Sequence, residues 1–198
     1  MTTTQIEKIF YEPKQIQIYS TQLAKKIHDS GCKPDHVVAV LRGGGFIANI
    51  VHETLMYLEK RNNPNSTYEP TFTGITTSRY SKTNLDEKIK TPHIDPINNL
   101  TYKVKENHCI LIIDDVIDKG YTMLALKNKI KNELMNKNPT IKTAVIDNKP
   151  SKREVDIEPD YYINKREKWI WYGQDLNGYT PQEIRENQGE IIAKILGI

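Results

Sequence analysis

Two apolar runs without polar alternation dominate the hydrophobic pattern of the chain. One covers Val37–Leu41, and the other covers Ile110–Ile113, directly after Cys109. An uninterrupted apolar run of this length is typical of a strand that is buried on both faces, as in a parallel sheet. Each run is followed by a glycine-bearing turn and then by apolar positions at helical spacing, over about 46–60 and about 121–138. The pattern predicts repeated strand, turn and helix units and an α/β fold.

The rest of the chain carries weaker secondary-structure signals. They predict an amphipathic helix over about 14–30, strands at Thr71–Thr77, Thr143–Ile146, Tyr161–Ile163 and Trp169–Tyr172, and a C-terminal helix over about 181–196. The last helix begins at Thr180–Glu183, a capping box with proline at the first helical position. Between about 78 and 100 the sequence has many charges and no clean period, which predicts a functional or disordered loop. A β-ribbon is the alternative for part of that loop.

Carboxylates, a glycine and a hydroxyl follow the second apolar run in close succession. Asp114 and Asp115 end the strand, and Asp118, Gly120 and Thr122 lie in the turn before the helix. The first amides of a helix lack an intrahelical partner and favour an anion, and glycine lets the backbone approach a phosphate closely. A carboxylate accepts hydrogen bonds from two neighbouring ribose hydroxyls. The stretch therefore suits a phosphorylated sugar, and the alternative is a strand followed by a solvated, acid-capped helix start.

Arg42 and three glycines, Gly43–Gly45, form the turn after the first apolar run. By the same reasoning this turn predicts a second anion site, with a guanidinium beside exposed amides. The alternative is a tight turn between a strand and a helix that happens to carry a surface arginine.

Composition adds limits to this picture. Of 198 residues, 37% are hydrophobic and 27% are charged, which is ordinary for a soluble globular protein and favours one domain over residues 1–198. The formal net charge of +3 is too small to argue for a nucleic-acid partner. No apolar run reaches membrane-spanning length, and the N-terminus lacks the apolar core of a signal peptide. Cys32 and Cys109 do not make a disulfide framework or a metal site, so we expect reduced thiols, a cytoplasmic location and no membrane association.

The stretch Cys109–Thr122 resembles the phosphoribosyl pyrophosphate (PRPP) motif of the type I phosphoribosyltransferases, with a hydrophobic run, two acids, two aliphatic residues and D-x-G-x-T. The resemblance implies the type I phosphoribosyltransferase fold, with a mostly parallel central sheet, flanking helices and a small hood. It implies that Asp114 and Asp115 hold the ribose diol and the waters of a Mg²⁺ ion. The magnesium would bridge the pyrophosphate and the ribose hydroxyls and keep few protein ligands.

The same resemblance assigns the turn after the two acids to the 5′-phosphate of PRPP. The residues of this turn are Asp118, Lys119, Gly120, Tyr121 and Thr122. Asp118 is also the family's candidate base for the ring nitrogen of a purine. Lys119 departs from the family pattern, in which a small hydroxyl residue is usual, and its charge is expected to replace the missing hydroxyl.

The glycine-rich turn after the first run resembles the pyrophosphate loop of purine phosphoribosyltransferases. The resemblance implies that Leu41, Arg42 and Gly43 hold the pyrophosphate as its charge grows, which makes Arg42 a catalytic candidate. It also implies a cis peptide between Leu41 and Arg42.

Family members carry a mobile loop after the third strand, often with a Ser-Tyr pair near its start. Ser78 and Tyr80 are the nearest matches in this chain, and Arg79 separates them. The resemblance implies that this loop closes over the reaction centre and excludes water.

Lys149, the D-Y-Y strand at Asp160–Tyr162 and the pattern W-I-x-x-x-x-D at Trp169–Asp175 together resemble the base-binding hood of bacterial and fungal xanthine, guanine and hypoxanthine phosphoribosyltransferases. The resemblance implies that Lys149 donates to the 6-oxo oxygen of a purine and that Trp169 stacks on the base. It places the backbone of Ile170 at the edge of the base, and Asp175 near its exocyclic group or a second magnesium. Asp175 therefore joins Asp114 and Asp115 as an expected metal-binding acid.

As a whole, the resemblance implies one domain, with a core over about 14–148 and a hood formed by about 149–175 with an N-terminal contribution. It implies an enzyme of purine salvage that transfers the phosphoribosyl group of PRPP to N9 of hypoxanthine, guanine or xanthine, giving a nucleoside 5′-monophosphate and pyrophosphate. The alternatives are another base such as orotate, uracil or adenine, a regulatory PRPP sensor, or a relative of PRPP synthetase. PRPP and a purine base are the expected partners, and the family implies a homodimer or homotetramer.

Overall fold

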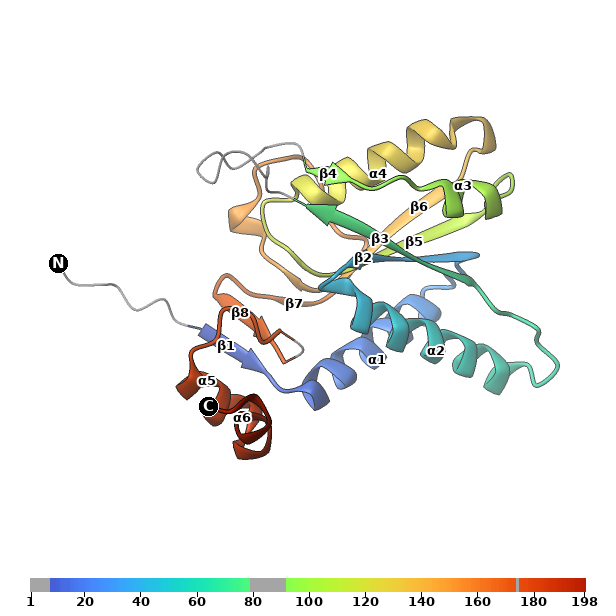
Figure 1. Ribbon diagram of the computed structural model, residues 1–198. Coiled ribbons are helices and arrows are strands. Elements are labelled where there is room, and N and C mark those ends of the chain that lie inside the picture. The colour runs from blue at the N-terminus through green and yellow to red at the C-terminus, as the bar shows by residue number, and fades with distance from the viewer. Residues whose placement is uncertain (1–7, 79–91, 174) are drawn as a thin grey trace.

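A six-stranded sheet forms the centre of the computed structural model, which describes residues 8–78, 92–173 and 175–198. The strand order is β4-β3-β2-β5-β6-β7 (Figure 1). The strands are β2 (His36–Leu41), β3 (Thr71–Ser78), β4 (His93–Ile94), β5 (Cys109–Ile117), β6 (Thr140–Asn148) and β7 (Tyr161–Lys165). All neighbours pair in parallel except β3 and β4, which are antiparallel. The predicted α/β fold with a mostly parallel central sheet is confirmed.

Helices cover both faces of this sheet. The helices at the sheet are α1 (Pro13–Asp29), α2 (Gly44–Asn62), α3 (Asn98–Lys103) and α4 (Tyr121–Glu133), with short 3₁₀ turns at Met135–Lys137 and Pro150–Lys152. Two further helices, α5 (Pro181–Gln188) and α6 (Glu190–Leu196), lie at the C-terminus, away from the sheet (Figure 1). Figure 1 shows α1 and α2 on one face and α3 and α4 on the other. None of the helices in the described part of the chain combines the length and apolar character that spanning a bilayer requires.

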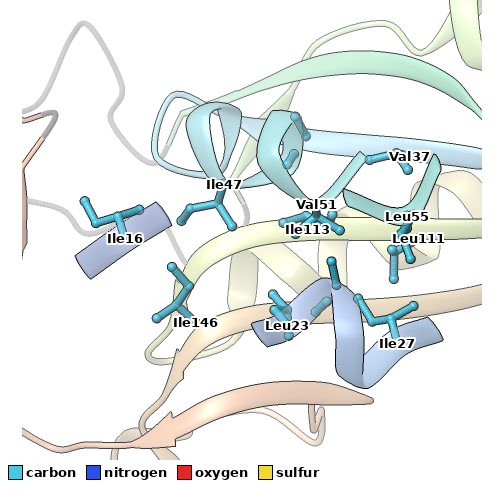
Figure 2. Close-up of a cluster of buried hydrophobic side chains, with 14 of the residues drawn as sticks. Ile16, Leu23, Ile27, Val37, Ile47, Val51, Leu55, Leu111, Ile113 and Ile146 are labelled. Atoms are coloured by element: carbon cyan, nitrogen blue, oxygen red, sulfur yellow. The ribbon is translucent and has the colours of Figure 1, made fainter. Parts of the chain in front are cut away.

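The side chains of β5 explain why its apolar run has no polar alternation. Leu111 and Ile113 belong to the cluster that packs with α1 and α2, and Figure 2 shows them near Leu23 and Val51. Ile110 and Ile112 belong to the cluster on the opposite face, with α3 and α4. Because each of these side chains is buried, and each contributes about 1.5–3 kcal/mol, a polar residue on either face would be costly.

A separate two-stranded ribbon lies beside the main sheet. It pairs β1 (Lys8–Tyr11) in parallel with β8 (Trp169–Tyr172), with Lys8 opposite Trp169 and Tyr11 opposite Tyr172. The segment expected to form the hood is therefore divided, because β7 is not part of this ribbon. Instead, β7 pairs with the free edge of β6 and satisfies backbone groups there that would otherwise lack partners.

Three further elements differ from the sequence-based expectations. The predicted C-terminal helix is two helices, α5 and α6, which Gly189 separates with a φ of +89°. The helix predicted to reach about 138 ends at Glu133, because Leu134 leaves the helical conformation before a short 3₁₀ turn. The segment predicted as a loop up to about 100 contains β4, which pairs with β3 as the ribbon alternative expected, and it runs into α3.

The two cysteines lie at the end of the sheet where β5 begins. Both are free and half-buried, and the Sγ atoms of Cys32 and Cys109 are 4.0 Å apart.

Candidate active site

A cleft of about 910 Å³ opens at the carboxyl ends of the parallel strands, where the β1–β8 ribbon faces the main sheet. Its walls are the turn after β2 (Leu41, Arg42, Gly43), the end of β3 (Thr76, Thr77, Ser78), β5 and its turn (Asp115, Val116, Asp118, Thr122), Lys149, β8 (Trp169, Ile170, Trp171, Tyr172) and Asp175, Leu176 and Asn177. The carboxyl ends of strands are where open α/β sheets bind ligands. The structure therefore brings residues from five separate stretches of the chain to one cleft.

Most of the predicted site residues that the structure describes line this cleft, but four do not. Asp114, Lys119, Gly120 and Tyr121 are not among the lining residues. Tyr80 lies outside the described residues.

Asp114 and Asp115 end the buried part of β5 and are held by backbone amides. Asp114 Oδ1 accepts from the Asp115 amide at 2.9 Å, and Asp115 Oδ1 accepts from the Val116 amide at 2.6 Å. Burial raises the pKa of Asp114 well above its ordinary value, and the neighbouring Asp115 carboxylate adds to the rise. Burial also raises the pKa of Asp115 to about 6, and the charge of Asp175 acts in the same direction. The cleft thus concentrates carboxylates that repel one another, a charge pattern that a cation would relieve.

The turn after β2 approaches Asp115 closely. The peptide between Leu41 and Arg42 is cis, as the resemblance implied. A Cβ atom placed on Gly43 would lie only 2.1 Å from Asp115 Oδ2, so no larger residue fits at this position without displacing the carboxylate. Arg42 is exposed. Burial raises the pKa of Asp175, and the positive charge of Arg42 acts to lower it.

The turn between β5 and α4 presents the start of a helix. Gly120 has a φ of +90°, a conformation that favours glycine, and it precedes the first residue of α4. A Cβ on Gly120 would also meet Ile157 Cγ2 at 2.8 Å. Gly120, the residue before α4, has no side chain with which to cap the helix, and the first turn of a helix favours an anion. Thr122, in this first turn, lines the cleft.

Lys119 does not supply its charge to the cleft in the way that was expected. Its Nζ forms an ion pair with Glu154, and Glu154 Oε2 also accepts from the Tyr121 hydroxyl at 2.9 Å. The amide of Glu154 donates to the Lys119 carbonyl at 3.1 Å. Lys119 therefore attaches the turn to the segment after β6, where the exposed Glu154 carboxylate is its partner.

Arg153 supports the turn after β5, although its sequence context does not single it out. Its Nη1 donates to the Asp118 carbonyl at 2.6 Å, and its Nη2 donates to Asn148 Oδ1 at 2.5 Å. The guanidinium thus connects the turn after β5 to the end of β6. In the sequence Arg153 stands in a run of charged residues that is typical of a solvated surface.

Asp118 and Lys149 both line the cleft. Asp118 Oδ1 is buried and has no hydrogen-bond partner within the described residues. Lys149 is 3% exposed, and burial lowers its pKa while the charge of Asp118 acts to raise it. A buried acceptor without a partner is costly unless a ligand supplies a donor. The pair therefore presents one acceptor and one donor to a bound molecule.

The two tryptophans of β8 have different surroundings. Trp171 stacks on Tyr179, with ring centroids 4.0 Å apart and an angle of 18° between the planes. Trp169 is 48% exposed, and Lys149 Nζ lies 5.7 Å from the centroid of its ring. Trp169 is therefore the tryptophan that can accept a planar ligand beside Lys149, while the Trp171 ring, which also borders the cleft, is already stacked on Tyr179.

The expected metal-binding acids do not form a complete metal site. The described residues contain no group of three or more His, Cys, Asp or Glu side chains that could hold an ion together. Asp115 and Asp175 line the cleft, and the charge of Asp175 acts to raise the pKa of Asp115, whereas Asp114 is not among the lining residues. Such a set suits Mg²⁺, which keeps several waters and needs only one or two carboxylates in addition to substrate oxygens.

Comparisons with known proteins agree with this arrangement. The family model described as "Phosphoribosyl transferase domain" matches residues 8–178. The chain therefore belongs to the phosphoribosyl transferase family, and its architecture is the type I phosphoribosyltransferase fold. A search of curated protein sequences gives no significant match.

Among solved structures, a purine phosphoribosyltransferase from Pyrococcus horikoshii is 23% identical with a TM-score of 0.65, over 88% of this chain and 98% of that one. A hypothetical protein from Neisseria gonorrhoeae with bound ppGpp is 22% identical with a TM-score of 0.67, over 96% and 98% of the two chains. A xanthine-guanine-hypoxanthine phosphoribosyltransferase from Helicobacter pylori is 17% identical with a TM-score of 0.65, over 86% and 96%. At these identities the likeness establishes the fold and not the activity.

Proposed function

We propose that this protein transfers the phosphoribosyl group of PRPP to N9 of a 6-oxopurine and releases pyrophosphate. The observation that carries the proposal is the placement of Lys149 and Asp118 at one cleft with the exposed ring of Trp169. The three side chains offer a donor, an acceptor and a stacking surface, which together match one face and the polar edge of a purine. Two of the solved structures described above, from Pyrococcus horikoshii and Helicobacter pylori, are named as phosphoribosyltransferases of purines.

Recognition of the base would come from side chains that converge on the cleft. Lys149 Nζ would donate to the 6-oxo oxygen, a role that suits a carbonyl and not the amino group of adenine. Trp169 would stack on the ring, and the backbone of Ile170 would contact its edge. The unpartnered Oδ1 of Asp118 would accept the proton that the attacking ring nitrogen loses.

Recognition of PRPP would come mainly from backbone groups. The first amides of α4 and the Thr122 hydroxyl would hold the 5′-phosphate, and Asp114 and Asp115 would hold the ribose diol. The backbone of Leu41 and Gly43, with Arg42, would hold the pyrophosphate as its negative charge develops. Most of the rate gain would come from positioning and charge stabilisation, with proton transfer to Asp118 as a smaller contribution.

Magnesium would belong to this site together with the substrate. Asp115 and Asp175 would hold its waters at the cleft, with Asp114 behind them. When bound, the ion would neutralise the pyrophosphate and ribose oxygens beside these acids.

An assay of pyrophosphate release tests the proposal directly. Purified protein with PRPP and magnesium is given hypoxanthine, guanine, xanthine, adenine, orotate or uracil in turn. We expect release with at least one 6-oxopurine, and little or none with adenine or the pyrimidines. Pyrophosphate release only with adenine, orotate or uracil would show that the enzyme uses a different base. PRPP binding without turnover would favour a regulatory sensor. A cytoplasmic location and a dimer or tetramer stay predictions.

A further inference from the structure

A buried carboxylate that the proposed chemistry does not use connects the β1–β8 ribbon to the main sheet. Asp147 lies on β6 and is 0% exposed. Its Oδ1 is 3.0 Å from the hydroxyl of Tyr11 on β1, and its Oδ2 is 2.9 Å from the hydroxyl of Tyr172 on β8. One side chain of the sheet therefore contacts a tyrosine from each strand of the ribbon.

The Tyr172 hydroxyl also reaches the sugar-phosphate side of the cleft. It lies 2.9 Å from the backbone carbonyl of Asp115, the acid expected at the ribose diol. Val116, the next residue, is the register partner of Asp147 across the β5–β6 ladder. Asp115 itself has little freedom, because its Oδ2 lies against Gly43. The hydroxyl thus joins β8, which carries Trp169, to the backbone of a residue that would bind PRPP.

The direction of these hydrogen bonds follows from counting protons. Tyr172 has one hydroxyl hydrogen, yet two acceptors lie at 2.9 Å, namely Asp115 O and Asp147 Oδ2. A backbone carbonyl carries no proton to share. Both contacts are full hydrogen bonds only if Asp147 is neutral and its carboxyl hydrogen is donated to the Tyr172 oxygen, which leaves the tyrosine hydrogen for Asp115.

The rest of the network is compatible with that direction. Asn164 Nδ2 lies 3.4 Å from the Tyr11 hydroxyl, which in turn donates to Asp147 Oδ1. Burial raises the pKa of Asp147. The hydroxyls of Tyr172 and Tyr11 and the charge of Arg166 lower it, but the effect of burial is larger. The Arg166 Nε atom is 3.6 Å from Asp147 Oδ1 and has no hydrogen-bond partner within the described residues. The charged neighbour is therefore present but is not hydrogen-bonded to the carboxyl.

We propose that neutral Asp147 is a positioning residue, which directs the Tyr172 hydroxyl onto the Asp115 carbonyl and so fixes the base side of the cleft to the PRPP side. This inference rests on the proposed function, since Asp115 is assigned there to PRPP. Asp147 itself does not line the cleft, so its effect on substrates is indirect.

Three variants test the inference by steady-state kinetics. Tyr172→Phe removes the hydroxyl, and we expect KM for PRPP to rise about three- to tenfold, the value of one lost hydrogen bond, with a smaller change in kcat. Asp147→Asn keeps the shape of a neutral carboxyl and replaces its O–H donor by an N–H donor, so KM for PRPP should stay within about twofold of wild type. Tyr68→Phe is the matched control, because Tyr68 also donates to a backbone carbonyl at 2.9 Å, that of Pro34, but does not line the cleft. It should lower thermal stability and leave KM unchanged.

The inference is overturned if Tyr172→Phe keeps the wild-type KM for PRPP, or if Asp147→Asn is as damaging as Tyr172→Phe, which would mean that the charge of Asp147 is required. Infrared difference spectra of wild type and Asp147→Asn give an independent readout. A carbonyl stretch of a protonated carboxyl that the substitution removes supports the inference, and its absence contradicts it. If the wild type neither turns over nor binds PRPP, the proposed function fails, and the infrared band alone then decides whether Asp147 is neutral.

Discussion

The two sides of the cleft are built differently. The side that we propose for the sugar phosphates consists of two turns, after β2 and after β5, in which backbone groups would do most of the binding and Gly43 and Gly120 leave room for them. The base side consists of side chains, Lys149 after β6 and Trp169 on β8, which are brought together by a ribbon that includes the N-terminal strand.

This difference predicts how each side responds to change. Backbone groups cannot be exchanged one at a time, so a substitution in a turn displaces several of them and should affect every base equally. Side chains can be truncated individually, so substitutions on the base side should cost less and should depend on the base that is supplied.

The largest effect is expected from Gly43→Ala. The added Cβ would lie 2.1 Å from Asp115 Oδ2, so either the turn or the acid must move. We expect kcat/KM to fall roughly a hundredfold or more with every base, as a displacement of about 1 Å at a reacting centre can produce. Gly45→Ala in the same turn is the control, because its Cβ would meet only the end of the Leu41 side chain, at 3.1 Å. Equal losses in the two variants would contradict the close approach as the cause.

Asp118→Asn tests a side chain that we propose to serve both sides. The amide keeps the size of the carboxyl but cannot take a proton, so kcat should fall by up to about a hundredfold, while the dissociation constant of PRPP changes much less. Steady-state kinetics and titration calorimetry measure the two quantities. Equal loss in both would show that Asp118 mainly binds PRPP and is not the base.

Lys149→Met should act on the base side alone. Removing a charged donor to a carbonyl costs about 1.5–3 kcal/mol, so kcat/KM for a 6-oxopurine should fall roughly 10- to 100-fold with KM for PRPP nearly unchanged. Competition between hypoxanthine and adenine measures the selectivity, which should shift towards adenine. A parallel rise in KM for PRPP would contradict the prediction that the base side and the sugar-phosphate side bind their substrates independently.

Trp169→Ala is expected to have a smaller effect of the same kind. Stacking of a base on an aromatic ring is worth about 1–3 kcal/mol, which corresponds to roughly a tenfold rise in KM for the base. Trp171→Phe is the comparison, because Trp171 is stacked on Tyr179 and should contribute to stability and not to KM. The opposite result would exchange the roles of the two tryptophans.

The smallest effect on catalysis is expected from a histidine at the opposite end of the sheet. His36 is 2% exposed, its Nδ1 is 2.6 Å from Thr71 Oγ1, and its Nε2 is 2.8 Å from His108 Nδ1. Burial, followed by the charge of His108, lowers its pKa to about 4. Between pH 6.5 and 4 the unfolded chain therefore binds more protons than the folded one. The free energy of unfolding should fall as the pH falls, by up to about 3 kcal/mol.

Denaturant unfolding at several pH values measures this loss. The difference in pH slope between wild type and His36→Gln isolates the histidine from other titrating groups. Equal slopes would exclude His36 as the cause, and any activity lost before unfolding begins would then belong to the cleft itself.

The strand, turn and helix arrangement from β5 to α4 could be predicted from the sequence because its residues are contiguous. A buried strand, acids, a glycine and a helix start follow one another from Cys109 to Thr122, and local rules connect such a pattern with an anion site. The approach of Gly43 to Asp115 could not be predicted, since it depends on the pairing of β2 with β5.

The base side and its supports depend on contacts between distant residues. The sequence could not show that Tyr161–Lys165 joins the main sheet, because its aromatic pattern suits either sheet. It also could not reveal the partner of Lys119 or the role of Arg153, since both lie in charged stretches whose ordinary explanation is solvation. The contact of Asp147 with two tyrosines joins three strands that lie far apart in the chain.

A crystal structure of the protein with PRPP and magnesium is the most direct test of the central claim that one cleft binds the activated sugar through two turns. We expect the 5′-phosphate at the amides of Gly120 to Thr122, the ribose diol at Asp114 and Asp115, and the pyrophosphate at Leu41 to Gly43. PRPP bound elsewhere, or a cleft without PRPP at saturating concentration, would contradict the account.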